Sequence, residues 1–204
     1  MTELLAAQMA AMSVLEGIAV TLAIAYLVLA IRQSVWCWPC AFVSTALYIY
    51  LFGNVSLYME STLNLFYMVM AVYGFYRWRQ GATTTAAAPV VVLRAQSHIA
   101  AALVIAVLIA LSATLLTRYT DQVLPAVDAF TTWTAVWATW LTAREVLENW
   151  WYWVAIDLVS AALCFERGLP LTGLLFVVYL FMIPFGYVAW KSSWRDAGEL
   201  RVAL

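Results

Sequence analysis

Two tryptophans and an aspartate lie on one face of an apolar segment in the last third of the chain. Trp150, Trp153 and Asp157 follow one another at steps of three and four residues, which places them on the same side of an α-helix. Indole rings stack on flat rings and attract positive charge, and a carboxylate neutralises that charge. The stripe predicts a binding site for a flat aromatic cation. The alternative is that the tryptophans belong to a membrane interface and that Asp157 pairs with another helix.

Polar side chains in two other apolar segments are candidates for the same site. Asn64 and Tyr67 share a helix face, and so do Ser44 and Tyr48. Their amide and hydroxyl groups suit the polar edges of a ligand. Such groups also bond a neighbouring helix or the carbonyl one turn earlier, so a purely structural role stays open.

The composition requires a membrane to hold these segments. Of 204 residues, 66% are hydrophobic and 10% are charged, and the net charge is -1. A water-soluble fold of this size could not bury so much apolar surface. A disordered chain, a secreted disulfide scaffold and a nucleic-acid-binding domain are excluded, the last because no basic field is present. We therefore predict an all-α integral membrane protein.

Seven apolar segments are predicted to be membrane-spanning helices, of which the fifth and sixth are short for a span. The runs do not alternate apolar and polar residues, as barrel strands would. The predicted spans are Val14–Ile31, Val35–Phe52, Leu57–Trp78, His98–Thr117, Val127–Ala143, Trp150–Phe165 and Leu171–Lys191.

The basic residues predict the orientation. No basic residue precedes Arg32, which argues against a cleavable signal peptide, and residues 4–13 read as an amphipathic lead-in. The positive-inside rule puts the N-terminus outside and the C-terminus in the cytoplasm of a bacterial inner membrane. The inner basic residues are then Arg32, Arg77, Arg79, Arg94, Arg144, Lys191, Arg195 and Arg201, against Arg118 and Arg167 outside.

An internal repeat organises the single transmembrane domain. Tyr67, Tyr73, Gly74 and Trp78 recur with the same spacing as Tyr179, Phe185, Gly186 and Trp190, and Ser44 upstream is matched with Ser160. Repeat one covers about 14–80 and repeat two about 127–191. The segment Gly81–Pro89 is a flexible connector, and a linker helix at about 98–117 follows it.

A single linker helix makes the two repeats parallel. Parallel repeats of three helices each are a transporter architecture, with the substrate bound near the midplane where the repeats meet. A duplicated scaffold or sensor without a pathway is the alternative. Pro184 and Gly186 interrupt the last helix and could form a hinge.

The single histidine and the cysteines bear on other kinds of chemistry. One histidine, His98, and no cluster of ligating side chains predict neither a metal site nor a cofactor. The run from Trp36 to Cys40 has the outline of a thioredoxin-type redox site, so a membrane thiol oxidoreductase using Cys37 and Cys40 is the competing enzyme hypothesis. We predict no enzyme and no catalytic residues, because nothing in the chain reads as the strands of that redox fold.

Two groups of motifs resemble one family of membrane proteins, the PnuC vitamin transporters. The first half contributes Trp38-Pro39, Leu47-Tyr48, Leu57-Tyr58, Asn64, Tyr67, Tyr73-Gly74, Tyr76 and Trp78. The second half contributes Arg144-Glu145, Glu148-Asn149-Trp150, Trp153, Asp157 and Ser160, of which the block from Glu148 to Trp153 is the most specific. The resemblance covers about residues 14 to 195.

The resemblance implies a fold and a function. Family members are similar in arrangement to SWEET sugar transporters, with a 3+1+3 bundle, and associate as homotrimers. They take up nicotinamide riboside, and close relatives take up thiamine or riboflavin. Transport is facilitated diffusion, and a cytoplasmic vitamin kinase traps the product by phosphorylation. Trp150 and Trp153 would be the ligand-stacking residues, and Asn149 lies in the same motif.

This chain departs from the family pattern at positions that line its cavity. Where this chain has Asn64, enterobacterial nicotinamide riboside carriers have a glutamine. They have an asparagine at the positions of Ser44, Ala71 and Asp157. An aspartate at 157 favours a cationic vitamin, and both nicotinamide riboside and thiamine are cations. Nicotinamide riboside is the leading substrate and thiamine the alternative.

Overall fold

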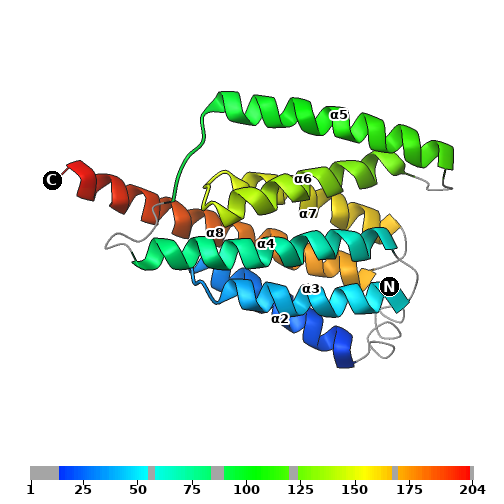
Figure 1. The fold of residues 1–204 in the computed structure, drawn as a ribbon, viewed down its shortest axis with the longest axis horizontal. Coiled ribbons are helices and arrows are strands. Elements are labelled where there is room, and N and C mark those ends of the chain that lie inside the picture. The colour runs from blue at the N-terminus through cyan, green and yellow to red at the C-terminus, as the bar shows by residue number, and fades with distance from the viewer. Residues whose placement is uncertain (1–13, 55–57, 84–89, 120–123, 167–169, 203–204) are drawn as a thin grey trace.

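The computed structural model describes residues 14–54, 58–83, 90–119, 124–166 and 170–202, and this part of the chain is helical nearly throughout (Figure 1). Its seven helices confirm the predicted fold class and lie close to the predicted spans. Residues 4–13, most of the connector and Arg167 are outside the described residues. The helices are α2 (Val14–Ile31), α3 (Cys37–Asn54), α4 (Tyr58–Thr83), α5 (Ala95–Tyr119), α6 (Pro125–Ala143), α7 (Asn149–Glu166) and α8 (Pro170–Val202).

The helices differ in how apolar they are. Three described stretches are long and apolar enough to cross a membrane by length and composition alone: Val14–Ile31, Ala95–Tyr119 and Thr172–Ala197. The other helices carry more hydroxyl, amide and acidic side chains. This difference is expected of a bundle whose helices share polar groups in the interior.

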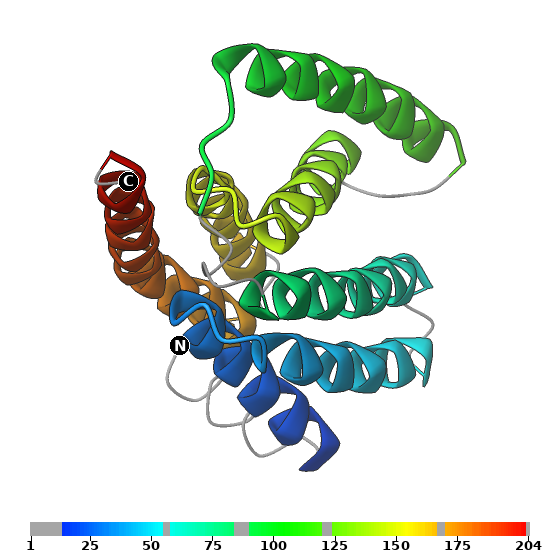
Figure 2. The same cartoon turned by 60° about the vertical axis from the view of Figure 1, so that its left-hand side comes forward.

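The six helices other than α5 form two triplets. In the first triplet α3 packs between α2 and α4, and in the second α7 packs between α6 and α8. The triplets meet where α4 contacts α6 and where α2 contacts α8. Helix α5 connects them and packs along α6 at the outside of the bundle, as Figures 1 and 2 show.

Matching turns join the first two helices of each triplet. Gln33 and Glu145, 112 positions apart, both adopt a positive φ, of 53° and 56°. The next residue in each turn reaches back five positions, with Ser34 N–H donating to Leu29 at 2.9 Å and Val146 N–H donating to Leu141 at 3.0 Å. This left-handed helix ending reverses the chain within five residues in each triplet.

The same offset of 112 positions relates the helices that follow. It takes the start of α3 at Cys37 to the start of α7 at Asn149, and Gly74 and Trp78 to Gly186 and Trp190. Because the offset has no gap, Ser44 corresponds to Ile156, and the predicted match with Ser160 is wrong. Asp157 corresponds to Thr45 in the first triplet.

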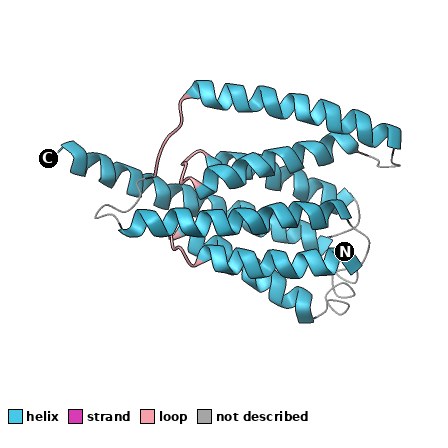
Figure 3. Cartoon of the chain, viewed as in Figure 1, coloured by secondary structure: helices cyan, strands magenta, loops and turns pink. Residues whose placement is uncertain are grey.

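Both turns and the segment before α5 lie at one end of the bundle, which we name the basic end because Arg32, Arg94 and Arg144 lie there (Figure 3). Val91 forms an isolated parallel β-bridge with Val146, in which Val91 N–H donates to Glu145 and Leu147 N–H to Val91. The predicted connector begins too early, because α4 continues to Thr83.

Candidate binding site

A carboxyl and three tyrosine hydroxyls from four helices gather between the two triplets. Asp157 of α7 is 4% exposed and lies within electrostatic range of Tyr67 of α4 and Tyr179 of α8. Tyr26 of α2 lies within the same range of both tyrosines. Tyr67 and Tyr179 are 112 positions apart, so each triplet contributes one equivalent phenol. We name these four residues the central cluster.

The polar groups of the central cluster lack hydrogen-bond partners in the part of the chain that the structure describes. Within the described residues, neither the Asp157 carboxyl nor the hydroxyls of Tyr26, Tyr67 and Tyr179 form a hydrogen bond. Asp157 is buried, whereas the three tyrosines are half-buried. A buried carboxylate that lacks a hydrogen-bond partner or a counter-charge is costly. The arrangement is therefore suited to a ligand that supplies hydrogen bonds and positive charge.

Trp153 borders the central cluster. It is half-buried and packs, together with Tyr67, against Ala135, Ala138 and Ile156. Its indole N–H donates to the Thr142 hydroxyl at 3.3 Å, which fixes the ring on α6. The Trp153 ring and Tyr67 thus pack against the same three buried residues.

Trp150 has a different environment from Trp153. Its ring lies over Gly186, where an added Cβ would overlap the indole, and it meets Trp190 with ring centroids 5.5 Å apart. Trp150 is 3% exposed. The predicted helix face is present, but its first tryptophan is packed against α8.

The amide of Asn149 is used to begin α7. Its Nδ2 donates to the Val146 carbonyl at 2.6 Å, and its Oδ1 accepts from the Thr142 hydroxyl at 3.2 Å. The side chain is 1% exposed. Asn149 therefore holds the turn and the α6–α7 contact, and through Thr142 it also orients Trp153.

Ser44, Tyr48 and Asn64 lie on the first triplet. Ser44 donates to the Ala19 carbonyl at 2.8 Å and thereby joins α3 to α2. Tyr48 lies within electrostatic range of Glu16 and of Tyr179, which extends the cluster along α3. Asn64 is half-buried and lies one turn before Tyr67 on α4.

Tyr26 and Tyr179 were not among the residues predicted for the site. Tyr179 carried a usable signal, because it is the repeat counterpart of Tyr67. Tyr26 carried none, since a single tyrosine in an apolar run is as compatible with packing, and it also packs on Trp38 with centroids 6.0 Å apart.

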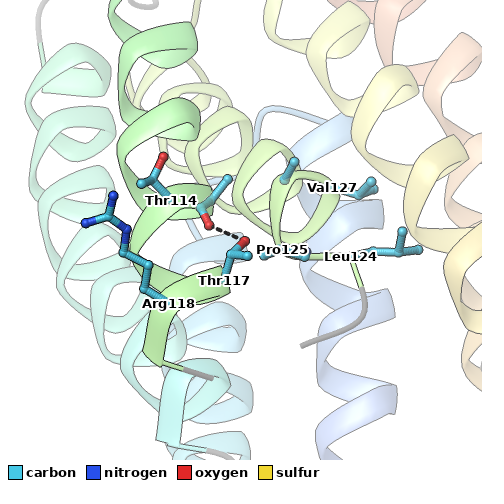
Figure 4. Close-up of a pocket in the computed structure, with 8 residues that line it drawn as sticks. Thr114, Thr117, Arg118, Leu124, Pro125 and Val127 are labelled. Atoms are coloured by element: carbon cyan, nitrogen blue, oxygen red, sulfur yellow. Dashed lines mark hydrogen bonds between the residues drawn. The ribbon is translucent and has the colours of Figure 1, made fainter. Parts of the chain in front are cut away.

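An open groove at the other end of the bundle lies between α5 and α6 (Figure 4). Thr114, Thr117 and Arg118 of α5 line it, facing Leu124 and Pro125. Both threonine hydroxyls donate to carbonyls of their own helix at 2.7 Å. The groove therefore offers a ligand little beyond Arg118.

The surroundings of the cysteines do not support the competing hypothesis of a membrane thiol oxidoreductase. Cys37, Cys40 and Cys164 are free, and Cys37 is fully buried in the first turn of α3. Among the described residues the isolated bridge at Val91 is the only extended pairing, so the β-sheet that carries such a motif in thioredoxin-like proteins has no counterpart in them.

The comparisons with known proteins identify the family. A model described as nicotinamide mononucleotide transporter matches residues 13–192. The chain belongs to the nicotinamide mononucleotide transporter family. It is a multi-pass membrane transporter and not an enzyme, and the resemblance to PnuC proteins in the motifs is confirmed.

Two relatives of this nicotinamide mononucleotide transporter family member differ in their named vitamins. The riboflavin/roseoflavin transporter RibM of Streptomyces davaonensis is 32% identical over 180 residues, which cover 84% of this chain and 82% of that protein. The crystal structure of the vitamin B3 transporter PnuC matches with a TM-score of 0.72 at 23% identity, covering 89% of this chain and 82% of that one. The structural match shows the fold.

Proposed function

We propose that the protein takes up nicotinamide riboside by facilitated diffusion, and that Asp157 is the counter-ion for its pyridinium ring. The observation that carries the proposal is the buried Asp157 carboxyl, which has no basic partner among the described residues and faces tyrosines from both triplets. A bound cation would neutralise this carboxylate, which is otherwise expensive in a membrane interior.

Each site residue has a proposed role in this binding mode. Trp153 stacks on the pyridinium ring, and Tyr67 and Tyr179 bond the ribose hydroxyls, with Asn64 and Tyr48 flanking them. Trp150, Asn149 and Ser44, all predicted to touch the substrate, hold the surrounding helices through the contacts described above. Their proposed contribution is therefore the shape of the site.

We also propose the membrane orientation, the intracellular trapping and the oligomeric state that the sequence predicts. The basic end faces the cytoplasm, where eight of the ten basic residues would lie, and the N-terminus is outside. A cytoplasmic kinase phosphorylates the vitamin and maintains the gradient, so no coupling ion is needed. The transporter is proposed to work as a homotrimer.

Two other vitamins define the alternatives. Thiamine is also an aromatic cation and would use Asp157 in the same way. Riboflavin is favoured by the 32% identity with RibM. Its uncharged ring system, however, would leave a buried carboxylate without a counter-charge, which costs several kcal/mol unless the group is protonated.

Calorimetric titration of the purified protein with the three vitamins in parallel tests the proposal. We expect nicotinamide riboside to bind at least about tenfold more tightly than thiamine, a difference of about 1.4 kcal/mol, and riboflavin to give no heat. Tight riboflavin binding without nicotinamide riboside binding would overturn the assignment. Binding of none of the three would favour the scaffold or sensor alternative.

A further inference from the structure

Four buried tryptophans form a continuous layer at the basic end. Trp38, Trp78, Trp150 and Trp190 are each at most 4% exposed. Ring centroids are 5.3 Å apart between Trp38 and Trp78, 6.0 Å between Trp78 and Trp190, and 5.5 Å between Trp190 and Trp150. The layer therefore crosses the bundle from α3 to α7 without a break.

The layer consists of two equivalent halves. In the first triplet Trp38 lies over Gly74, and in the second triplet Trp150 lies over Gly186. Each is also in edge-to-face contact with the second tryptophan of its own triplet. Separation of the triplets at this end would keep both halves intact, and within the layer it would break only the ring contact between Trp78 and Trp190.

Hydrogen bonds across the seam are present on one side of the layer. The indole N–H of Trp190 donates to the Ala30 carbonyl of α2 at 2.9 Å, and the Gln33 amide donates to the Ser193 hydroxyl at 2.8 Å. The equivalent indole N–H of Trp78 is buried and has no partner among the described residues. We call each contact between the two triplets a seam. At the α2–α8 seam the tryptophan forms a hydrogen bond to the other triplet. At the α4–α6 seam the equivalent tryptophan forms none among the described residues.

Helix α8 has a point at which it can bend. Pro184 lies inside α8, six residues before Trp190, and removes one hydrogen bond from the helix backbone. The segment that carries Trp190 and Ser193 can therefore move relative to the first half of α8, which carries Tyr179.

We propose that Trp190 is the latch of a gate at the basic end of the transport pathway. Its hydrogen bond to Ala30 and its contact with Trp78 hold the two triplets together below the central cluster. Release requires the segment of α8 after Pro184, together with the start of α7 that packs on it, to move away from α2, so that Trp38 and Trp150 stay on their glycines. The inference rests on the pathway lying between the triplets, but it does not depend on which vitamin is carried.

Cys37 is a built-in reporter of this gate. It is fully buried in the same cluster as Ala30, Trp38 and Trp190. With Cys40→Ser and Cys164→Ser it becomes the single thiol of the chain, and its rate of reaction with a small maleimide measures how often the layer opens. No substrate is needed, so this test can fail or succeed independently of the vitamin assignment.

Trp190→Phe and Trp78→Phe form a matched pair in this background. Both keep an aromatic ring, but only the first removes a hydrogen bond across the seam. We expect Trp190→Phe to accelerate labelling of Cys37 about fivefold, and Trp78→Phe to change it by less than about twofold. Equal acceleration in both variants, or none in either, would overturn the latch. Thermal midpoints separate local opening from global unfolding, because acceleration that merely follows a lowered midpoint also counts against the proposal.

A second variant keeps the proposal testable if Trp190→Phe does not fold. Ser193→Ala removes the acceptor of the Gln33 amide at the half-exposed edge of the same seam. We expect labelling of Cys37 to accelerate about twofold. An unchanged rate in Ser193→Ala would contradict a gate at the α2–α8 seam.

Discussion

At the scale of single residues, the central cluster combines one carboxyl with phenols that no described residue satisfies. Tyr67 and Tyr179 are placed by equivalent positions of α4 and α8, so the site takes one hydroxyl from each triplet. Its charge is one-sided, since Asp157 has Thr45 as its counterpart, and the Thr45 hydroxyl donates to the Ala41 carbonyl of its own helix. In the proposed binding mode, this asymmetry would favour one orientation of a substrate with a cationic ring and a neutral sugar.

Tyr67→Phe and Tyr179→Phe test the role of these hydroxyls. Because neither hydroxyl bonds a described residue, its removal should not lower the thermal midpoint. Its loss should weaken binding of nicotinamide riboside about fivefold, the worth of one hydrogen bond. Calorimetry and thermal unfolding check the two statements, with exposed Tyr76→Phe as the control. A lowered midpoint with unchanged affinity would assign the hydroxyls to structure.

At the scale of the elements, the turn between α6 and α7 carries a buried acidic residue. Burial raises the pKa of Glu145 from 4.5 to about 7, and the nearby Arg77 guanidinium partly offsets this effect. The unfolded chain therefore loses this proton at lower pH than the folded protein. Between about pH 4.5 and pH 7 the folded protein binds more protons, so its stability falls as the pH rises through that window.

Glu145→Gln should remove this pH dependence. Gln33 already occupies the equivalent position at nearly the same positive φ, so the substitution fits the turn. The thermal midpoint of the variant should exceed that of the parent at pH 8 and approach it at pH 4.5, with a gain at pH 8 of about 1–3 kcal/mol. A variant whose pH profile parallels the parent's across this window would show that Glu145 is not the titrating group.

Close contacts between helices depend on two equivalent glycines. A Cβ at Gly74 would overlap the Trp38 indole, and one at Gly186 would overlap the Trp150 indole. Gly74→Ala and Gly186→Ala should each destabilise the protein by about 1–3 kcal/mol through overpacking. Gly173→Ala is the control, because its Cβ would meet the Phe165 ring at 3.0 Å, where a small movement suffices. Equal thermal midpoints for all three variants would contradict the claim that the absence of a side chain at Gly74 and Gly186 is needed for tryptophan packing.

The elements could be predicted from the sequence more fully than the site. The apolar runs predicted the helices to within a few residues at most ends. They missed the part of α8 after Lys191, because the last turns of that helix are polar. The face shared by Trp150, Trp153 and Asp157 followed from helical spacing. Helical spacing could not predict which of the two tryptophans lies beside Asp157. Trp150 packs on Gly186, which is on another helix and 36 positions away in the sequence.

At the scale of the whole molecule, eight of the eleven tryptophans fall into three groups. Four tryptophans close the basic end, Trp153 borders the central cluster, and Trp36, Trp151 and Trp194 are 66%, 59% and 42% exposed near the same end. Exposed tryptophans at one level of a helical bundle are typical of a membrane interface. The two triplets thus enclose a polar centre, with an aromatic layer between it and one face of the membrane.

The central claim is that Asp157 selects a cationic vitamin, and calorimetric titration of Asp157→Asn against the parent tests it most directly. Asparagine preserves the shape of the side chain, as a control for packing, and removes its charge. Nicotinamide riboside affinity should fall about 10- to 100-fold, as expected for a charged interaction in a buried site, while the thermal midpoint does not fall. Unchanged affinity for nicotinamide riboside in a folded Asp157→Asn variant would contradict the account.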